Sequence, residues 1–250
     1  MLLQGRNAIV YGGGGLVGGA MARGFAGAGA RVHLAGRTAA TLDKVASDIR
    51  SAGGAAETVV LDALDAEQVD AHADAVQREF GSLDISANVI SVGDIQGTPL
   101  AEMDVEDFLA PVHNATRSTF LTTRAASRHM IPQGSGVILT FGGGGHNEPV
   151  HDYSIGGFYV AMAALDAMRR QLAAELGKNG IRVVTLHSGG LPESLPDDEK
   201  EIAEGLVEGT LLGRAADLTD VGNVAVFAAS DLARSITGAS INITAGAETD

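Results

Sequence analysis

A run of glycines near the amino terminus has the composition of a phosphate-binding turn. The strand-like segment Asn7–Tyr11 leads directly into Gly12–Gly18, with the sequence GGGGLVG, and a helical pattern begins at Leu16. Glycines let the backbone N–H groups at the positive end of a helix approach a diphosphate closely. Two spacings fit the run, Gly12-x-x-Gly15-x-x-Gly18 and Gly13-x-Gly15-x-x-Gly18. The pattern predicts a dinucleotide site, rather than a merely structural turn, with backbone contacts from Gly12, Gly15, Leu16 and Gly18.

The end of the second strand-like segment indicates which dinucleotide is bound. An acidic residue there would hydrogen-bond the ribose hydroxyls of NAD, whereas this chain has Ala35-Gly36-Arg37. The guanidinium of Arg37 can pair with a 2′-phosphate in a bidentate, charge-assisted contact. We therefore expect NADP, with NAD as the second choice. The alternative for Arg37 is a surface residue at the start of the helix that begins near Thr38.

Strand-like and helical segments alternate along the whole chain. The expected strands are Asn7–Tyr11, Arg31–Ala35, Glu57–Leu61, Asp84–Val89, Gly136–Phe141, Arg182–Leu186 and Ser240–Ile243. The expected helices are Leu16–Ala28, Ala39–Ala52, Ala66–Phe80, Val105–Met130, Phe158–Lys178 and Ala216–Ala229. Parallel neighbours need crossover connections, so this alternation predicts an α/β fold with one parallel sheet covered by helices on both faces. No linker divides residues 1–250, which we expect to form a single domain.

The composition excludes several classes of function. The 250 residues include 17 Lys plus Arg against 31 Asp plus Glu, for a formal net charge of −14, and no cysteine. Such a chain has no disulfide, no thiol nucleophile and no cysteine-bearing metal site. Its negative charge repels phosphate backbones and anionic lipid, and it lacks a run of about 18 apolar residues. We expect a cytoplasmic protein without a signal peptide, acting on a small molecule and not on nucleic acid or membrane.

One segment interrupts the alternation. Residues Gly189–Gly213 are acidic and show no clear apolar stripe before Ile202. We expect a flexible lid over the substrate at 189–213. The alternative is an ordinary solvated loop.

Several motifs, taken in chain order, resemble those of the short-chain dehydrogenase/reductase family. They are GGGGLVG, Leu61-Asp62, LDISAN, AAELGKNGIRV and the terminal LLGRAADLTDVGNVAVFAASDLARSITGASINITAG. The resemblance spans essentially the whole chain. It implies one Rossmann-type domain, a doubly wound sheet of seven parallel strands in the order 3-2-1-4-5-6-7, assembled as a homo-oligomer, either a dimer or a tetramer. It also implies that Asp62 lies near the adenine and Asn88 beside the cofactor.

The catalytic residues of that family are largely missing. The family uses a Ser after the fifth strand, Tyr-x-x-x-Lys at the start of the next helix, and an Asn on the preceding helix. Counting back from ALDAMRRQLAAELG puts Phe158 at the Tyr position and Met162 at the Lys position, and the Ser position falls within Gly142–Gly145. Asn114 precedes by one residue the expected Asn position, where Ala115 falls. No lysine lies four residues after a tyrosine, because the lysines are Lys44, Lys178 and Lys200.

Other side chains could take part in proton transfer. On the resemblance, the loop after the fifth strand carries His146, His151, Asp152 and Tyr153, and His187 ends the sixth strand. Histidine exchanges protons near neutral pH, although an ordinary hydrogen-bonded or surface role is the alternative for each histidine. Tyr159 lies next to the Tyr position, and we expect it to pack within the protein or at a subunit contact rather than to donate a proton. The catalytic candidates are Tyr153, His151, His187 and Asn114. A metal held by His146 and His151 with Glu148 or Asp152 has no recognised spacing, so no metal is expected.

Two functions fit these residues. The first is an NADP(H)-dependent oxidoreductase, more readily a reductase of a carbonyl, imine or activated alkene, with a non-standard proton relay. A phenol with a pKa of about 10 donates a proton more easily than it accepts one at neutral pH, which favours reduction. The second is a redox-silent protein on the same fold, such as a nucleotide-binding partner subunit or a non-redox biosynthetic enzyme.

Overall fold

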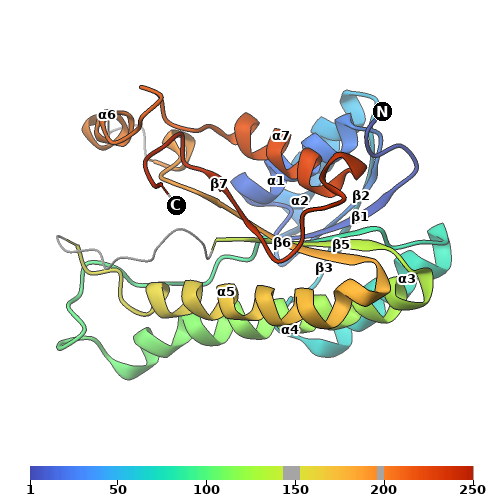
Figure 1. The fold of residues 1–250 in the computed structure, drawn as a ribbon, viewed down its shortest axis with the longest axis horizontal. Coiled ribbons are helices and arrows are strands. Elements are labelled where there is room, and N and C mark those ends of the chain that lie inside the picture. Colours follow the sequence, from blue (N-terminus) through green and yellow to red (C-terminus); the bar gives the residue numbers. More distant parts are fainter. Residues whose placement is uncertain (143–152, 196–199, 250) are drawn as a thin grey trace.

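A parallel sheet forms the centre of the molecule (Figure 1). The computed structural model describes residues 1–142, 153–195 and 200–249. Within them, seven strands lie in the order β3-β2-β1-β4-β5-β6-β7, and all neighbours are parallel. The strands are β1 Asn7–Tyr11, β2 Arg31–Gly36, β3 Ala55–Val60, β4 Ile85–Asn88, β5 Gly136–Phe141, β6 Ile181–Ser188 and β7 Ser240–Ile243. The predicted doubly wound α/β fold and strand order are therefore confirmed.

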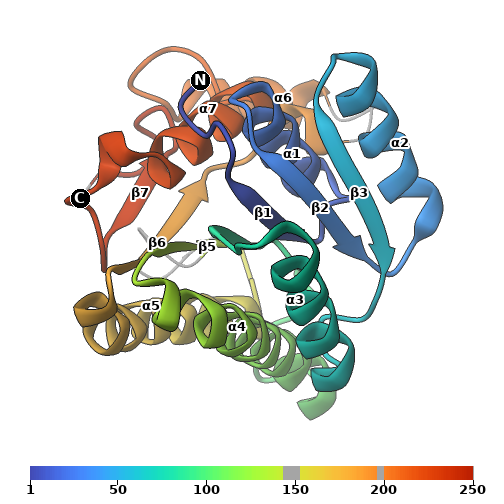
Figure 2. The same ribbon diagram turned by 90° about the vertical axis from the view of Figure 1, so that its right-hand side faces the viewer.

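Helices cover both faces of the sheet (Figure 2). One layer contains α1 Leu16–Gly27, α2 Ala39–Ser51 and α7 Leu218–Ala229, and the other contains α3 Ala66–Phe80, α4 Val105–Gln133 and α5 Gly157–Leu176. The side chains of β1 alternate between the two cores. Ala8 and Val10 pack with the layer of α1, whereas Ile9 and Tyr11 pack with the layer of α3. Burial of apolar surface on both faces, at about 25 cal/mol per Å², stabilises this arrangement.

Two buried histidines lie between β2 and α3. His33 on β2 is 2% exposed, His72 on α3 is 7% exposed, and their ring centroids are 6.5 Å apart. Phe80 and Tyr11 complete the aromatic group. Burial disfavours the charged imidazolium and lowers the pKa of both histidines to about 4, with smaller contributions from the charge of Arg31 on His33 and of His33 on His72. Both rings are therefore neutral at pH 7.

The segment predicted as a lid contains regular structure. A short 3₁₀ helix spans Pro192–Ser194 and α6 spans Lys200–Glu208, a helix that the sequence did not predict. Residues 196–199 lie outside the described residues. A Cβ on Gly190 would lie 2.4 Å from the side chain of Leu206, so α6 packs directly on the chain that leaves β6. Among the described helices, none is long and apolar enough to cross a membrane.

Candidate active site

The glycine turn after β1 has space only for glycine at several positions. Gly12 has φ +84°, and a Cβ there would lie 2.1 Å from the carbonyl oxygen of Val89. A Cβ on Gly18 would lie 2.2 Å from the carbonyl oxygen of Gly12. That carbonyl also accepts a hydrogen bond of 3.0 Å from the amide of Gly15. The backbone of the turn is therefore packed tightly against the first residues of α1 and the end of β4.

The amino end of α1 is arranged to receive an anion. Its N-cap residue is Gly15, which has no side chain to accept a hydrogen bond from the first turn, and that turn contains no acidic residue. Leu16 is 53% exposed, so the start of the helix faces open space. Amide N–H groups and the helix dipole both favour negative charge at such an end. The geometry fits the predicted diphosphate contacts.

The ends of β2 and β3 carry the residues that would meet the nucleoside. Arg37 is exposed immediately after β2, and its side chain makes no hydrogen bond or ion pair with any residue that the structure describes. Asp62 follows β3, and its carboxylate accepts a hydrogen bond of 2.9 Å from the amide of Leu64. A surface cavity of about 400 Å³ lies beside Asp62, with Arg117 in its wall. The guanidinium of Arg37 is thus available to a phosphate.

Asn88 lies at the carboxyl end of β4, buried beside the glycine turn. Its amide nitrogen donates to the hydroxyl of Thr119 at 2.9 Å and lies 3.3 Å from the hydroxyl of Ser118, both on α4. Its buried Oδ1 has no hydrogen-bond partner among the described residues. Because a buried acceptor without a donor is costly, this oxygen is a contact point for a bound N–H or O–H group.

Apolar side chains fill the positions that the family resemblance assigns to Tyr and Lys. Met162 on α5 is 5% exposed and belongs to an apolar cluster that includes Phe158 and Leu165. A Cβ on Gly142, which directly follows β5, would lie 2.8 Å from the sulfur of Met162. The rest of the glycine segment, Gly143–Gly145, lies outside the described residues. The thioether of Met162, at the position that the resemblance assigns to Lys, is therefore packed against the start of the glycine segment.

Two of the catalytic candidates, Asn114 and Tyr153, lie against the loop after β4. Asn114 donates its amide to the carbonyl of Val92 at 2.9 Å and so ties α4 to the loop after β4. Tyr153 is 54% exposed, and its hydroxyl would lie 3.7 Å from a Cβ on Gly97 in the same loop. His151 lies outside the described residues, as do His146, Glu148 and Asp152. Within the described part of the chain, no three His, Asp or Glu residues form a group that could hold a metal ion.

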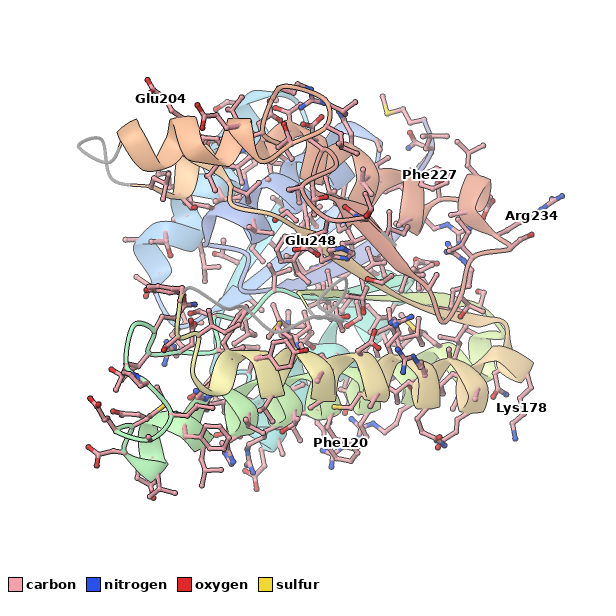
Figure 3. All side chains as sticks on the ribbon, turned by 60° about the vertical axis from the view of Figure 1, so that its left-hand side comes forward. Phe120, Lys178, Glu204, Phe227, Arg234 and Glu248 are labelled. Carbon is pink, nitrogen blue, oxygen red and sulfur yellow. The ribbon has the colours of Figure 1, made fainter. Side chains whose placement is uncertain are left out.

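His187 is the candidate with a buried, polar environment. It is 4% exposed on β6, and the preceding carbonyl, that of Leu186, accepts a hydrogen bond of 2.8 Å from the amide of Gly142. Its Nδ1 lies 2.9 Å from the hydroxyl of Ser240 on β7, and its Nε2 lies 3.9 Å from a carboxylate oxygen of Glu248. In the view of Figure 3, Glu248 is labelled near the centre of the picture, whereas Lys178, Glu204 and Arg234 lie toward its edges.

Sequence reasoning did not find Ser240 and Glu248. Glu248 reaches His187 because the chain turns back at Ala245 and Gly246, which have φ values of +55° and +87°. Glycine favours such a conformation, but alanine does not, so the sequence gives little indication of this turn. The backbone carbonyl of Glu248 accepts a hydrogen bond of 2.9 Å from the side-chain amide of Asn242.

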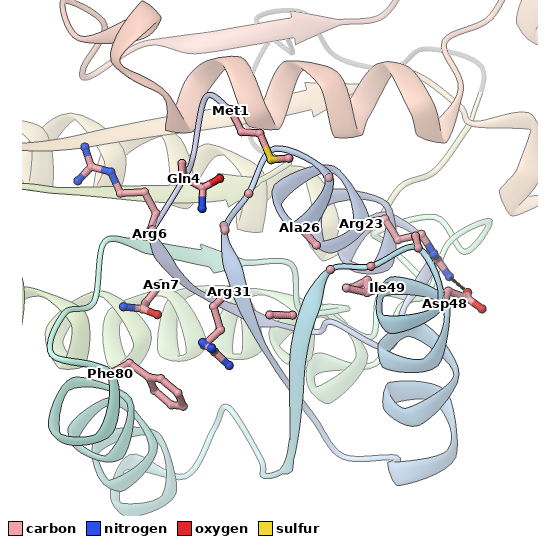
Figure 4. Close-up of a pocket in the computed structure, with 18 of the residues that line it drawn as sticks. Met1, Gln4, Arg6, Asn7, Arg23, Ala26, Arg31, Asp48, Ile49 and Phe80 are labelled. Carbon is pink, nitrogen blue, oxygen red and sulfur yellow. Dashed lines mark hydrogen bonds and ion pairs between the residues drawn. The ribbon is translucent and has the colours of Figure 1, made fainter.

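A separate cavity lies at the opposite edge of the sheet, at the amino ends of β1 to β3 (Figure 4). Its volume is about 780 Å³. The arginines in its wall already have acidic partners, since Arg6 pairs with Asp84, Arg23 with Asp48 and Arg31 with Glu57. Ligands of open α/β sheets bind at the carboxyl ends of the strands, so this cavity is not the candidate active site.

Comparison with known proteins identifies the family. A family model described as enoyl-(acyl carrier protein) reductase matches residues 16–248. The chain belongs to the short-chain dehydrogenase/reductase family. Gluconate 5-dehydrogenase of Gluconobacter oxydans is 28% identical and aligns with 98% of this chain and 95% of its own length. The enoyl-acyl-carrier-protein reductase (NADH) FabI of Synechocystis is 35% identical over 76% of this chain and 75% of its own length.

Solved structures of short-chain dehydrogenase/reductases have the same fold. A member from Serratia marcescens superposes with a TM-score of 0.88, 29% identity and complete coverage of both chains. A dehydrogenase/reductase from Sinorhizobium meliloti superposes with a TM-score of 0.87 and 32% identity, covering 99% of this chain and 96% of the other. The chain is thus an oxidoreductase of a family that uses NAD(P), in agreement with the prediction from its motifs.

Proposed function

We propose that this protein is an NADP(H)-dependent reductase of a carbonyl, imine or activated alkene. The observation that carries the proposal is the bare amino end of α1, packed against a glycine turn and followed at the next strand end by the exposed Arg37. When bound there, the nicotinamide would supply a hydride to the substrate. The protein contributes binding, orientation and a proton.

The amides at the start of α1, together with Gly12, Gly15, Leu16 and Gly18, would hold the diphosphate. Asp62 would lie toward the adenine, and the buried Oδ1 of Asn88 would accept a hydrogen bond from the cofactor. These assignments combine the family resemblance with the backbone geometry of the turn.

Arg37 favours NADP over NAD. Its guanidinium has no partner among the described residues, so pairing with a 2′-phosphate breaks no existing ion pair. The name of the Synechocystis relative gives NADH as its cofactor, so the relative affinity of this chain for NADPH and NADH is the quantity to measure. We expect NADPH to bind more tightly than NADH, and Arg37→Ala to weaken NADPH binding by about tenfold or more while leaving NADH binding nearly unchanged. Equal loss for both nucleotides would contradict this role for Arg37.

Tyr153 is the favoured proton donor among the described catalytic candidates. Its side chain is 54% exposed and lies against the loop after β4, whereas Nε2 of His187 is buried and faces Glu248. Asn114 carries no proton that titrates near neutral pH, and its amide is bonded to a carbonyl. We expect reduction rather than oxidation because position 162 holds Met and not Lys. A lysine ammonium group beside a tyrosine would favour the ionised phenol, which accepts a proton in the oxidative direction.

The substrate is a small molecule, and residues 189–213 would cover it. The support for a lid is that α6 packs on Gly190, immediately beyond the strand that carries His187. We further propose a homo-oligomer, a dimer or a tetramer, formed in the cytoplasm. Exposed apolar side chains on α4 and α5, among them Leu109, Phe120 and Val160, support a contact between copies. Light scattering coupled to gel filtration tests this, and a monomer at micromolar concentration would contradict it.

The experiment that tests the function is a turnover assay. The purified protein is incubated with NADPH and a panel of ketones, imines and enones, and loss of the reduced-nicotinamide absorbance is followed together with the reduced product. We expect NADPH consumption matched by product. The apolar packing of Met162 favours the second candidate, a redox-silent protein, for which NADPH would bind tightly without turnover.

A further inference from the structure

The negative charge of the chain is concentrated in two segments. Residues 89–107 contain five acidic side chains and no lysine or arginine, and residues 189–213 contain seven acidic side chains and one lysine. Together these two acidic segments carry −11 of the formal net charge of −14, so the rest of the chain is nearly balanced. Each segment begins where a strand ends, after Asn88 of β4 and after Ser188 of β6. The charge therefore gathers at the carboxyl edge of the sheet, where ligands of open α/β sheets bind.

Backbone contacts hold the first segment against the start of α5 and the second against the end of β6. A Cβ on Gly156, the N-cap residue of α5, would lie 2.8 Å from the carbonyl oxygen of Ile95. The amide of Gly97 donates to the carbonyl of Ser154 at 2.7 Å. In the second segment, α6 packs on Gly190. Figure 1 and Figure 3 both show α6 and the loop after β4 at the same end of the molecule, so the acidic segments flank the start of α5.

Several of these acidic side chains have no cationic partner in the described part of the chain. Glu102, Glu204 and Glu208 are exposed, and none makes an ion pair with a described residue. Unpaired charges of one sign create a common field, which raises the local concentration of cations and lowers that of anions. At the cofactor end of the sheet, by contrast, Arg37 would supply positive charge for a phosphate. The field at the substrate end therefore favours a cation.

The side chains at the family's Tyr and Lys positions suit a cationic substrate. Phe158 and Met162 are both uncharged and belong to one apolar cluster with Leu165. An ammonium group at position 162 would repel a cation, whereas an aromatic ring attracts one through its electron-rich face. A carbonyl that accepts a hydride gains negative charge on its oxygen, and neither Phe nor Met offers a hydrogen-bond donor to stabilise it. An iminium ion loses its positive charge instead, so it needs no such donor.

We propose that the substrate is an iminium ion, which the acidic segments attract and which needs no proton from the protein in the hydride step. This inference rests on the proposed reductase function and names its substrate class. The iminium carbon receives the hydride, and the π electrons of its C=N bond become the lone pair of an amine nitrogen. The positive charge passes from the substrate, which leaves as a neutral amine, to the oxidised nicotinamide, so atoms, electrons and charge balance. Tyr153 is required only for a neutral substrate, which must gain a proton.

The first test measures binding without turnover. N,N-dimethyl-tetrahydroisoquinolinium is a permanent cation that cannot accept a hydride, and tetralone is a neutral bicyclic ketone of similar size. Each is titrated calorimetrically into the protein without nucleotide. We expect the cation to bind about tenfold or more tightly than tetralone, and its affinity to fall as the salt concentration rises. Equal affinity for the two probes would overturn the proposal.

The second test reverses charge in each acidic segment. Glu204→Lys combined with Glu208→Lys changes α6, and Glu102→Lys changes the loop after β4. The matched control Glu79→Lys changes an exposed residue of α3 at the opposite edge of the sheet. All four side chains are exposed, so we expect the variants to fold. Charge reversal in either segment should weaken binding of the cation by about threefold or more, and Glu79→Lys should leave it unchanged. An equal loss in the control, or no loss in either segment, would overturn the proposal.

The third test is turnover of N-methyl-dihydroisoquinolinium with NADPH. Because an iminium accepts a hydride readily even without an enzyme, the rate without enzyme is subtracted and kcat/KM is compared between proteins. We expect the Glu204→Lys, Glu208→Lys protein to lose about threefold or more in kcat/KM, and Glu79→Lys to lose nothing. Reduction of tetralone but not of the iminium would refute the proposed substrate class. If neither is reduced and no other substrate consumes NADPH, the reductase function fails, whereas the binding tests still decide whether the site takes a cation.

Discussion

Substitution of Gly18 tests the glycine turn at the position where the structure leaves no space. A Cβ on Gly18 would lie 2.2 Å from the carbonyl oxygen of Gly12 and 2.8 Å from its carbonyl carbon. Both are backbone atoms, so relief requires the turn itself to move by about 1 Å. Overpacking of this kind costs about 1–3 kcal/mol, partly offset by a gain of up to about 1 kcal/mol from the higher helix propensity of alanine.

The displacement should be felt most by the cofactor. A charge-assisted hydrogen bond contributes about 1.5–3 kcal/mol, and every 1.4 kcal/mol is about tenfold in affinity. Loss of one amide contact to the diphosphate therefore predicts that Gly18→Ala weakens NADPH binding by about tenfold or more. Calorimetric titration with NADPH measures this, together with urea unfolding of the same sample.

The same helix provides the control. A Cβ on Gly27, the last residue of α1, would meet no atom within 4 Å, and Gly27 has no positive φ. We expect Gly27→Ala to bind NADPH like the wild-type protein and to be at least as stable. A folded Gly18→Ala protein that binds NADPH as tightly as Gly27→Ala would refute the reasoning about the turn.

Two further predictions concern buried side chains. Met162→Lys should destabilise the fold by about 3–5 kcal/mol because it buries an unpaired charge in an apolar cluster. Met162→Leu should cost less than about 1.5 kcal/mol. Equal midpoints of urea unfolding for the two variants would contradict this prediction. His33 and His72 have a pKa of about 4 in the folded protein and about 6.5 when unfolded, so the unfolded chain binds more protons between these values and the free energy of unfolding falls as pH falls from 6.5 to 4. The loss is roughly 3 kcal/mol per histidine. Urea unfolding at several pH values should therefore give a free energy of unfolding that depends less steeply on pH for His72→Gln than for the exposed control His113→Gln. An equal dependence on pH in the two variants would contradict this prediction.

Much of the fold follows from local signals. The predicted bounds of α3 were correct, and local contacts set them in the structure: Asp65 caps the first turn, accepting from the amides of Glu67 and Gln68, and Gly81 ends the helix with φ +81°. The bounds of β1, β5 and β7 were also correct. The strand order came from the family resemblance, and the structure confirms it.

The missed features depend on tertiary contacts. Helix α4 continues to Gln133, beyond its predicted end at Met130, even though it includes Pro132. Helix α6 lies in an acidic segment, and part of its packing is onto Gly190, which no periodic pattern indicates. The contact between His187 and Ser240 joins residues 53 positions apart. The glycines of the proposed cofactor site could be predicted from the sequence because their requirement for space is local, whereas the surroundings of His187 are assembled by the whole sheet.

The most direct test of the account is the stoichiometry of NADPH oxidation by the purified protein with an activated carbonyl, imine or enone. Hydride transfer without the family's Tyr and Lys predicts that each NADPH consumed yields one reduced product. It also predicts that Phe158→Tyr alone, which leaves Met162 in place, does not raise the rate markedly. Tight binding of NADPH with no product from any substrate would contradict the central claim.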